Sequence, residues 1–412
     1  MRAILLTSIF LAGCSSCSQK NNSSDAGTGD TGTDSDTDVD TDSDTETYST
    51  DAGPWDWQDI PSEGDCGPGC DQLTFTHSVR QGEWDVWDNL LACSSLTEEG
   101  TRIILIDVEE KKYLVIPDVY PEHPITAMEN GAFHPAVYQE EVRYILAYES
   151  GSGLRQEMIS VDLGAKTQTV IWGRDEPGTQ EWGALVNSVD SYGSKTVSRA
   201  GCGDPQTYSL CLYEEPWPSS GDVLIADSYG LGNSLWGDVV VFMDVRELPE
   251  DITGYRFSTQ QFFNVADEND GDEHQSLPRI YGSTVAYMDF RYGSGTPTGS
   301  WEHAAVFVKD IEGESVVEVT DGSAIAAFPD INDDVVVWLD WRHCSDPQDV
   351  GDSTCAEVYG YNLTSQNVVR VTDLPGRLKE RPRIWGERAF LDMQKLSGYN
   401  ALYMFSLPDG LK

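Results

Sequence analysis

The stretch PDINDDVVVWLDWR, residues 329–342, decides the fold, because related stretches recur along the chain. The clearest copies start with a PxIxG-like segment, pass a turn and continue into an apolar run that ends in Asp-x-Arg. Self-similarity at a period of about 20–50 residues is the signature of a repeat architecture. The copies are PRIYGSTVAYMDFR at 278–291, PRIWGERAFLD at 382–392, NSLWGDVVVFMDVR at 233–246, a fainter PAVYQEEVRYILAY at 135–148 and a poorer one near Asn187. They start 45 to 53 residues apart.

Within each unit the apolar runs are short, rich in Val, Tyr and Trp, and bounded by Gly, Asp and Pro, which is typical of β-strands. After the two strands of the quoted stretch, we expect a third at 357–362 and a fourth at 367–372. Four strands per repeat of about 50 residues predict an all-β fold, a β-propeller with four-stranded blades. The apolar second strand fits a sheet that is covered on both faces. A two-sheet sandwich is the alternative, and the regular spacing disfavours it.

The predicted number of blades is seven, with six as the alternative. An earlier unit before Pro135 is read from three further strands, at 90–93, 102–108 and 113–117. The last unit ends at Lys412 after its third strand, so its fourth strand must come from elsewhere. We predict that residues 73–79 (LTFTHSV) pair with 401–406 and close the ring, because an open ring would leave two unpaired sheet edges.

The PxIxG turn, the VxW/YxDxR strand and the closing Val-Thr-Asp at 319–321 and 371–373 resemble the TolB-type propeller family of periplasmic and exported bacterial proteins. The resemblance covers residues 230–412 well and 73–230 weakly. It implies a β-propeller that serves as a protein-interaction platform. This chain departs from the Tol-system protein because it has an acidic linker in place of an N-terminal α/β domain, so a role in that system is not implied.

The N-terminus predicts export and lipidation. A basic start and the apolar run AILLTSIFL, residues 3–11, form a secretion signal that is too short to span a membrane. The following Leu-Ala-Gly-Cys, residues 11–14, resembles a bacterial lipobox, which implies cleavage before Cys14 and acylation of that residue. Several acyl chains anchor a protein stably where one chain does not. We therefore expect a lipoprotein of the bacterial outer membrane, facing the periplasm or the cell surface.

The domain organisation follows from composition: a signal peptide at 1–13, a disordered Asp/Thr/Ser-rich tether at 14–65 and the propeller at 66–412. Residues 1–60 hold two basic and twelve acidic residues, a net charge of −10 out of −44 for the whole chain. Such a polyanion repels nucleic acid, so nucleic acid is excluded as a partner. We predict no metal site and no cofactor. Calcium binding by the Asp repeat at 33–47 is the alternative, but the repeat lacks the pattern of a calcium loop and a solvated tether is favoured.

Nine cysteines in an exported chain predict disulfides. We expect two short-range pairs, Cys202 with Cys211 and Cys344 with Cys355, because both flank turn-rich segments. The pairing of the remaining cysteines near the domain start is not deducible from their spacing. Those cysteines are Cys17, Cys66, Cys70 and Cys93.

Two groups of charged residues are expected on one face of the propeller. A candidate acidic ring follows the fourth strands and comprises Asp118, Asp227, Asp267, Asp321 and Asp373. The blade motif contributes Asp244, Arg246, Asp289, Arg291, Asp340 and Arg342. The structural interpretation is that the aspartates cap turns and that the Asp-x-Arg residues tie adjacent blades by charge-assisted bonds. The functional interpretation is an acidic mouth for cations or basic partner segments.

Enzyme signatures are missing from the sequence: it contains no GxSxG elbow, HExxH helix, phosphate loop or dinucleotide fingerprint. No catalytic residue is predicted. The favoured function is a lipid-anchored envelope protein with a non-catalytic propeller that binds a protein or another envelope component. One alternative is a propeller enzyme, a lyase or hydrolase acting on polysaccharide, whose histidines would converge from separate blades. The other alternative is a structural component of the cell surface. The oligomeric state is left open.

Overall fold

The computed structural model describes residues 47–48, 55–60, 69–74, 78–97, 100–120, 131–150, 153–177, 189–200, 209–215, 223–226, 229–245, 250–266, 274–293, 301–313, 315–349, 353–394 and 400–412. All regular structure in these ranges is β-strand, so the all-β prediction is confirmed. No helix within them is long and apolar enough to cross a membrane. By its contacts the chain divides into the units Met1–Asp44 and Thr45–Lys412, and the strands belong to the second.

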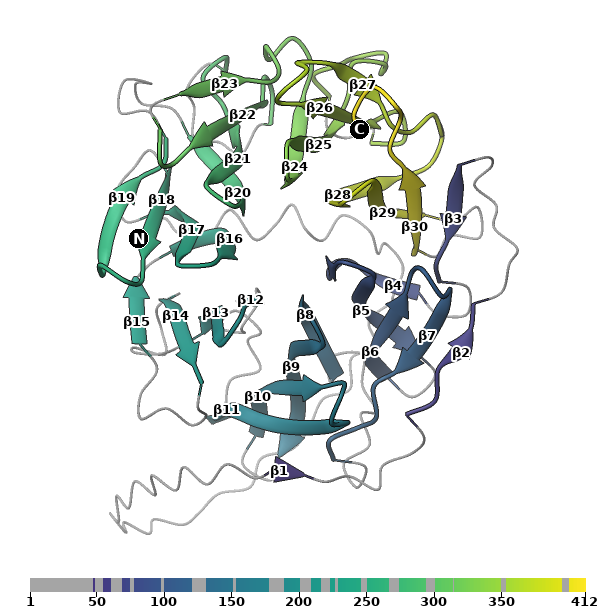
Figure 1. Ribbon diagram of the computed structural model, residues 1–412, viewed down its shortest axis with the longest axis vertical. Coiled ribbons are helices and arrows are strands. Elements are labelled where there is room, and N and C mark those ends of the chain that lie inside the picture. The colour runs from purple at the N-terminus through teal and green to yellow at the C-terminus, as the bar shows by residue number, and fades with distance from the viewer. Residues whose placement is uncertain are drawn as a thin grey trace, which may run out of the picture. The chain divides into compact units, whose positions relative to one another are not determined.

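The strands of the second unit form antiparallel four-stranded sets arranged around a ring (Figure 1). We call each set a blade and name it by its strands. Each first strand contacts the first strand of the next blade, from β4 through β8, β12, β16, β20, β24 and β28 back to β4. The β4–β7 and β8–β11 blades are joined into one larger sheet by a parallel bridge between Thr101 and Gly131. Grouped in this way, the described strands form seven sets. The number of blades in the whole ring stays a prediction.

The strands are given blade by blade, and within each blade from the innermost strand to the outermost, with these bounds. They are β4 (Ser78–Trp87), β5 (Leu90–Thr97), β6 (Gly100–Asp107) and β7 (Lys112–Val115); β8 (Gly131–Tyr138), β9 (Glu141–Ser150), β10 (Gly153–Asp162) and β11 (Thr167–Pro177); β12 (Val189–Tyr192), β13 (Lys195–Ala200), β14 (Ser209–Glu214) and β15 (Val223–Ala226); β16 (Tyr229–Trp236), β17 (Val239–Asp244), β18 (Asp251–Arg256) and β19 (Gln261–Asn264); β20 (Gln275–Tyr281), β21 (Thr284–Asp289), β22 (Ala305–Asp310) and β23 (Val316–Glu318); β24 (Ala326–Asn332), β25 (Val335–Asp340), β26 (Glu357–Asn362) and β27 (Val368–Arg370); and β28 (Lys379–Trp385), β29 (Arg388–Gln394), β30 (Asn400–Ser406) and β3 (Cys70–Gln72).

Strand β25 shows why the second strands are apolar throughout. All six of its residues are buried. Because successive side chains of a strand point to opposite faces, Val337 and Leu339 pack with residues of β29, whereas Trp338 packs with residues of β21 and β22. Each blade therefore buries both faces against its neighbours, which accounts for the stretch VVVWLD.

The PxIxG motif forms an irregular first strand. The residues before Pro135, Pro278, Pro329 and Pro382 have positive φ, from 36° to 56°, and the ladder register shifts at the same place. This is a β-bulge, in which an extra residue bends the strand. The glycine of the motif then lies in a two-residue turn, where Gly237, Gly282 and Gly386 also have positive φ. Pro and Gly thus set the bend and the turn of the first hairpin.

Ring closure occurs, but not through the predicted segment. Strand β3 pairs antiparallel with β30, and Cys70 lies opposite Phe405. The pairing continues as the backbone N–H of Leu73 donates to the carbonyl of Leu402 at 2.8 Å. The prediction that residues 73–79 form this strand is wrong, because residues 78–79 already belong to β4 and pair with β5. Strand β3, which closes the ring, therefore ends shortly before β4, the first strand of the first blade.

Two short strands extend the blades at their outer edges. Strand β1 (Thr47–Tyr48) pairs with β11, and β2 (Gln58–Asp59) pairs with β7. The backbone N–H of Ile60 donates to the carbonyl of Lys111 at 2.8 Å. The assignment of residues 14–65 to a disordered tether therefore does not hold for these strands.

One predicted disulfide is present. Cys344 and Cys355 are bonded, with their Cα atoms 5.2 Å apart. Cys70 and Cys211 each take part in a separate disulfide. Cys202 lies outside the described residues, so its pairing with Cys211 stays a prediction. Among the described cysteines, Cys93 is free and buried.

Replacing both Cys344 and Cys355 by Ser should lower the free energy of unfolding by about 2–3 kcal/mol, because the bond restricts the unfolded chain. Denaturant titration of oxidised protein measures the difference. Equal free energies for the two proteins would contradict the expectation.

Candidate functional site

The Asp-x-Arg residues form ion pairs within single blades. Asp340 is buried at the end of β25, and its carboxylate accepts hydrogen bonds from Nε and Nη2 of Arg342 at 2.8 and 2.7 Å. Arg342 then stacks over Tyr359 of β26, with 4.2 Å from Cζ to the ring centroid. Asp289 binds Arg291 in the same way, and Arg291 stacks over Phe307 of β22 at 4.0 Å. In these two copies the Asp-x-Arg bonds are therefore made within one blade, whereas we predicted bonds between adjacent blades.

The third copy of this motif is described only in part. Asp244 accepts a hydrogen bond from the Thr253 hydroxyl of the same blade at 3.4 Å, and Arg246 lies outside the described residues. The reason for the intrablade pairing is local geometry. An arginine two residues beyond a strand-end aspartate lies on the same side of the chain and can fold back onto it.

Three of the five residues of the predicted acidic ring are described, and each makes a local contact. Asp118 forms an ion pair with Arg102 at 2.7 Å. Asp321 accepts the backbone N–H of Ser323, and hydrogen bonds from Ser323 lower the pKa of Asp321. Asp373 is exposed and pairs with Arg370 at 2.7 Å. These contacts are of the turn-capping and ion-pairing kind. Asp227 and Asp267 lie outside the described residues.

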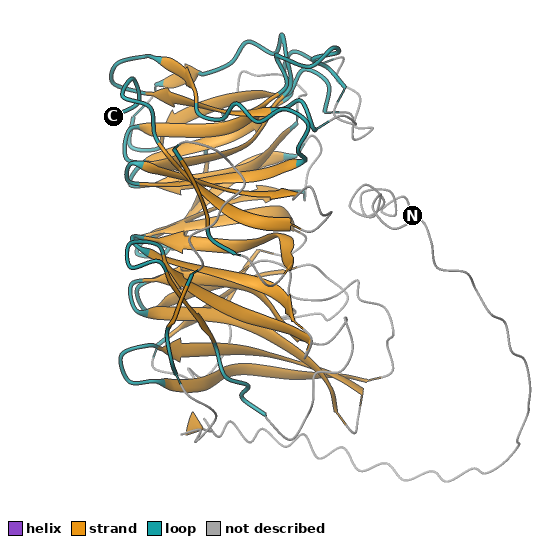
Figure 2. Ribbon diagram, turned by 90° about the vertical axis from the view of Figure 1, so that its right-hand side faces the viewer, coloured by secondary structure: helices purple, strands orange, loops and turns teal. Residues whose placement is uncertain are grey.

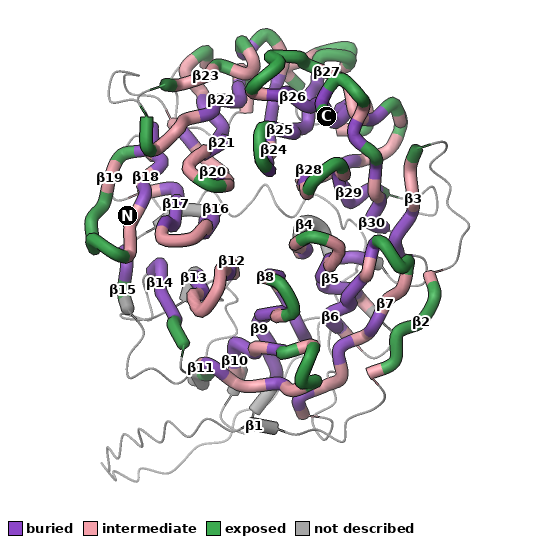
Figure 3. The backbone as a smooth tube through the Cα atoms, in the orientation of Figure 1, coloured by how far each residue is buried: buried purple, intermediate pink, exposed green. Residues whose placement is uncertain are grey.

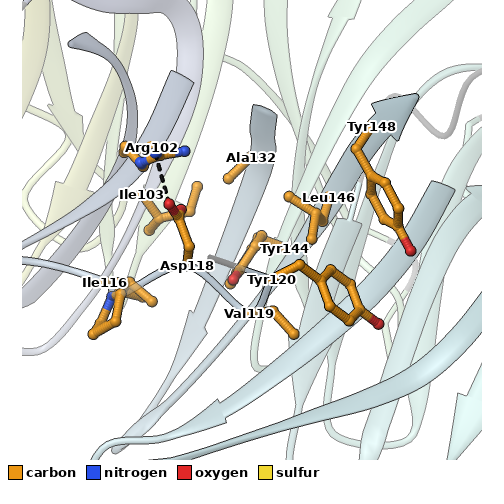
Figure 4. Close-up of a pocket in the computed structure, with 11 residues that line it drawn as sticks. Arg102, Ile103, Ile116, Asp118, Val119, Tyr120, Ala132, Tyr144, Leu146 and Tyr148 are labelled. Atoms are coloured by element: carbon orange, nitrogen blue, oxygen red, sulfur yellow. Dashed lines mark ion pairs between the residues drawn. The ribbon is translucent and has the colours of Figure 1, made fainter. Parts of the chain in front are cut away.

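A small cavity lies beside Asp118, between the β4–β7 and β8–β11 blades (Figure 4). Tyr120, Tyr144 and Tyr148 line it together with the Arg102–Asp118 pair. Its volume of about 10 Å³ is room for roughly one water molecule. The cavity is therefore too small for a substrate.

Polar side chains on the first strands connect neighbouring blades. The backbone N–H of Val137 donates to Asp85 at 2.9 Å, that of Leu235 to Asp190 at 2.8 Å, and that of Ile384 to Asp330 at 2.8 Å. Each donor belongs to the first strand of the blade that follows the acceptor. The Ser234 hydroxyl accepts the N–H of Ile280 in the same relation, at 3.3 Å. These bonds, rather than Asp-x-Arg, link blade to blade around the ring.

The aspartates of the first strands are enclosed together with arginines. Arg383 and Arg279 lie 3.5 and 3.8 Å from the Asp330 carboxylate. Burial raises the pKa of Asp190 to about 7, and the nearby Asp85 carboxylate adds to the shift. Burial likewise raises the pKa of Asp85. Both carboxyl groups thus hold protons more tightly in the folded chain than in the unfolded one.

This shift predicts a pH-dependent contribution to stability. Because the pKa of Asp190 is raised from 3.8 to about 7, its contribution is fully present below about pH 4 and is lost as the pH rises to about 7. Asp190→Asn removes the titration and keeps an oxygen for the Leu235 N–H. Between pH 4 and pH 8 the stability of the variant relative to wild type should rise by on the order of 2 kcal/mol. Denaturant titration at both pH values checks this, and a pH-independent difference would contradict it.

A cluster of aromatic side chains lies at the last position of the first strands, two residues beyond Asp85, Asp190 and Ser234. The last residue of a first strand is aromatic in six of the described blades, and Asn332 takes this place in β24. We call the six residues the aromatic cluster: Trp87, Tyr138, Tyr192, Trp236, Tyr281 and Trp385. All six are half-buried.

The aromatic side chains of the cluster contact one another across the centre of the propeller. Trp87 lies 4.5 Å from Tyr138, 4.4 Å from Trp385 and, across the ring, 5.5 Å from Trp236, measured between ring centroids. Trp236 lies 4.1 Å from Tyr281. Contacts at these distances are favourable for aromatic pairs. The side chains therefore gather at one end of the space enclosed by the first strands.

The aromatic cluster lies beside the two-residue turns that join first and second strands. Figure 2 shows short turns aligned along one side of the sheets, and we call this side the short-turn face. Five of the seven turns carry carboxylates, and none of the seven contains Lys or Arg. The carboxylates belong to Asp88, Glu140, Asp238, Asp333, Asp334 and Glu387. Figure 3 shows exposed turn tips beside the inner strand ends of several blades, such as β8, β24 and β28. The face is thus acidic around an aromatic centre.

The described histidines do not converge. His343 Nε2 contacts the Tyr359 hydroxyl, His303 Nδ1 lies 3.1 Å from the Gly322 carbonyl, and His274 lies 3.6 Å from Glu250. His134 is in β8 of another blade. Within the described ranges, no three His, Cys, Asp or Glu side chains are grouped so that they could hold a metal ion.

Comparison with solved structures shows which known folds this chain resembles. It matches an oligogalacturonate lyase from Vibrio parahaemolyticus with a TM-score of 0.60 and 12% identity, over 87% of this chain and 100% of that one. It matches the β-propeller domain of the trilobed protease from Pyrococcus furiosus with a TM-score of 0.56 and 11% identity, over 82% and 98% of the chains. The chain folds as a β-propeller. The propeller that the TolB-like motifs predict is thereby confirmed.

A TolB from Acinetobacter baumannii is also among the matched structures, with a TM-score of 0.39 and 13% identity over 77% of this chain and 79% of that one. A scan against family models and a search of the curated proteins gave no match. The oligogalacturonate lyase and the trilobed-protease domain, with TM-scores of 0.60 and 0.56, share the fold of this propeller. At 11–13% identity the three matched structures do not carry over their activities.

Sequence reasoning missed the aromatic cluster, although a signal for it was present. Tyr281, Trp236 and Trp385 each stand directly before the glycine of the PxIxG motif. Reading that position along all copies would have found a recurrent aromatic residue. The convergence of the rings, however, depends on how the blades are arranged around the ring.

Proposed function

We propose that this protein is a lipid-anchored envelope protein whose propeller is a non-catalytic platform, and that it binds its partner through the short-turn face. The observation that carries the proposal is the aromatic cluster. Half-exposed aromatic side chains gathered on one face are characteristic of binding sites, because they offer large contact area with little loss of side-chain entropy. The carboxylates of the surrounding turns form the polar rim of such a site.

The described polar groups support binding over catalysis. The Asp340 carboxylate is engaged by Arg342 and by the indole N–H of Trp338, and Asp330 is held by Ile384 and two arginines. The described histidines make separate contacts: His274 lies near Glu250, His303 near the Gly322 carbonyl and His343 near the Tyr359 hydroxyl. A catalytic site needs an acid, base or nucleophile aimed at one point. The described side chains are instead used to hold the propeller together.

The anchor is proposed from the sequence. Cys14 follows the lipobox-like residues 11–13, and the acidic tether would set the propeller at a distance from the outer membrane. Cys14→Ser should release the protein from the membrane fraction or leave it unprocessed. Unchanged membrane partitioning, together with a mature N-terminus that carries no lipid, would contradict the anchor.

The binding face can be tested separately from the anchor. Wild-type protein, cross-linked in detergent-solubilised envelopes and recovered by affinity, should bring down a partner that the double variant Trp236→Leu/Tyr281→Leu loses. The matched control is Asp321→Asn/Asp373→Asn, which changes two exposed aspartates beside fourth strands. Equal loss of the partner in both variants, or retention in both, would contradict the proposed face.

A second candidate function is a propeller enzyme acting on polysaccharide, favoured by the match over the whole length of an oligogalacturonate lyase. Incubation with polygalacturonate and detection of unsaturated products tests it. Turnover by the purified protein would replace the platform proposal. A structural surface component, the third candidate, would instead show no partner and no turnover.

A further inference from the structure

We infer that the aromatic cluster and the carboxylates of the short-turn face together bind a segment of a partner protein that carries Lys or Arg. This inference rests on the proposed function, because it uses the same face, and it adds the chemistry of the partner. Two independent features of the face favour a cation: the ring faces of the cluster and the charge of the turns around it.

The aromatic cluster offers the first feature. Trp87 and Trp236 stack at 5.5 Å, and Tyr281 and Trp385 flank them. All four rings remain half-exposed at the end of their strands. The face of an aromatic ring carries negative electrostatic potential, which attracts ammonium and guanidinium groups, and Trp attracts them best. A guanidinium can also stack flat on such a ring.

The charge of the turns is the second feature. Asp88 and Glu140 are exposed and lie one or two residues beyond Trp87 and Tyr138, and the exposed Asp333 and Asp334 follow Asn332 at the same position of β24. Of the basic groups near these turns, Arg388 donates to Asn89, and Lys412 pairs with Glu387 at 3.3 Å. Hydrogen bonds from neutral partners, such as that of Thr364 to Asp334, leave the carboxylate charge in place. The turns therefore present a net negative rim around the rings.

Other occupants match only one of these features or neither. A polyuronate or a nucleic acid is anionic and is repelled by the rim. A neutral sugar would use the rings and has no need of the carboxylates. A second copy of this chain carries a net charge of −44 and is repelled as a whole. A basic protein segment satisfies both the rings and the rim.

The test is the affinity of the full-length chain for a fluorescein-labelled hexa-arginine peptide, measured by anisotropy at about 0.15 M salt, where charges more than about 8 Å apart are screened. Hexa-glutamate and cellohexaose serve as the anionic and neutral probes. The variants are Trp236→Leu, Tyr281→Leu and the charge variant Asp88→Asn/Glu140→Gln. The matched charge control is Asp321→Asn/Asp373→Asn, which removes the same number of charges beside fourth strands.

Of the three probes, we expect saturable binding of hexa-arginine alone. Either aromatic variant, and Asp88→Asn/Glu140→Gln, should weaken the affinity for hexa-arginine about fivefold or more. The control should leave this affinity unchanged. Thermal unfolding of each variant establishes that it is folded, and Tyr281→Leu stands in if Trp236→Leu does not fold. Equal weakening by the control would show general attraction to a polyanion and overturn the inference. Unchanged affinity in folded aromatic variants, or binding of cellohexaose at this face, would also overturn it.

The outcomes separate this inference from the proposed function. If the aromatic variants lose the envelope partner but do not change hexa-arginine binding, the proposed binding function is supported and the inference of a partner segment with Lys or Arg is contradicted. If neither the binding of the envelope partner nor that of hexa-arginine is weakened by the variants of the short-turn face, both the proposed function and this inference are contradicted.

Discussion

Deleting residues 71–74 should abolish cooperative folding of the propeller or lower its free energy of unfolding by on the order of 5 kcal/mol. Leu73 is 3% exposed and packs with Trp84 and Phe390, so its removal opens the core between the first and last blades. The deletion also exposes the edge of β30 and removes the hydrogen bond from Leu402 N–H to the Thr74 hydroxyl. Every blade packs on two neighbours, so an opened ring loses support at both ends.

Thermal and denaturant unfolding measure this effect. Deleting residues 18–44, in the separate N-terminal unit, should leave the unfolding midpoint nearly unchanged and serves as the control. Leu73→Pro removes the N–H that donates to Leu402 and shortens the buried side chain but keeps β3, so its effect should lie between the two. A deletion of residues 71–74 that unfolds like wild type would show that β3 is not needed for ring closure.

Asp340→Ala should destabilise the propeller by about 2–4 kcal/mol. The substitution leaves the buried Trp338 indole N–H without its acceptor and removes two charge-assisted bonds to Arg342. A buried donor that loses its acceptor costs the full desolvation penalty, because water cannot replace the bond. Denaturant titration gives the difference in free energy.

Asp373→Ala is the matched control, since this aspartate also pairs with an arginine but its side chain is 78% exposed. Exposed ion pairs contribute at most about 1 kcal/mol, so the control should stay close to wild type. If Asp340→Ala were no more destabilising than Asp373→Ala, the Asp-x-Arg motif would not have the structural role described for it.

The strand content and the propeller fold could be predicted because each blade repeats a local pattern. The run VVVWLD of β25 is apolar at successive positions, and a strand of this kind must be covered on both faces. Pro329 and the glycine turns of the other copies mark the first hairpin. These patterns extend over only a few residues, so they can be recognised in a single sequence.

The closing strand was missed because its identity depends on its partner. Residues 73–79 include the apolar Leu73, Phe75 and Val79 and look like a strand, whereas the true strand, Cys70–Gln72, is short and polar. Its position is set by pairing with β30, more than 300 residues away along the chain. Residues 78–79 are instead taken by the long strand β4. The edge strand β2 was missed for the same reason, since Gln58–Asp59 carries no apolar pattern.

As a binding site, the charged residues chosen from the sequence stay a prediction; those within the described ranges make local contacts. Asp340 and Arg342 are conspicuous in sequence, but their spacing lets them pair with each other, which satisfies both. The aromatic cluster is less conspicuous, because one Tyr or Trp per repeat resembles an ordinary core residue. Only the arrangement of the first strands brings Trp87 to within 5.5 Å of Trp236, which is 149 positions further along the chain.

Site-specific photo-cross-linking in intact cells tests binding at the short-turn face most directly. A photoreactive amino acid is placed at Asp88 or Glu140 on that face and, for comparison, at Asp321 or Asp373. Binding through the short-turn face predicts a discrete adduct from positions 88 and 140, lost when Trp236→Leu is added, and none from 321 or 373. Adducts from 321 or 373 alone, or from none of the four positions, would contradict it.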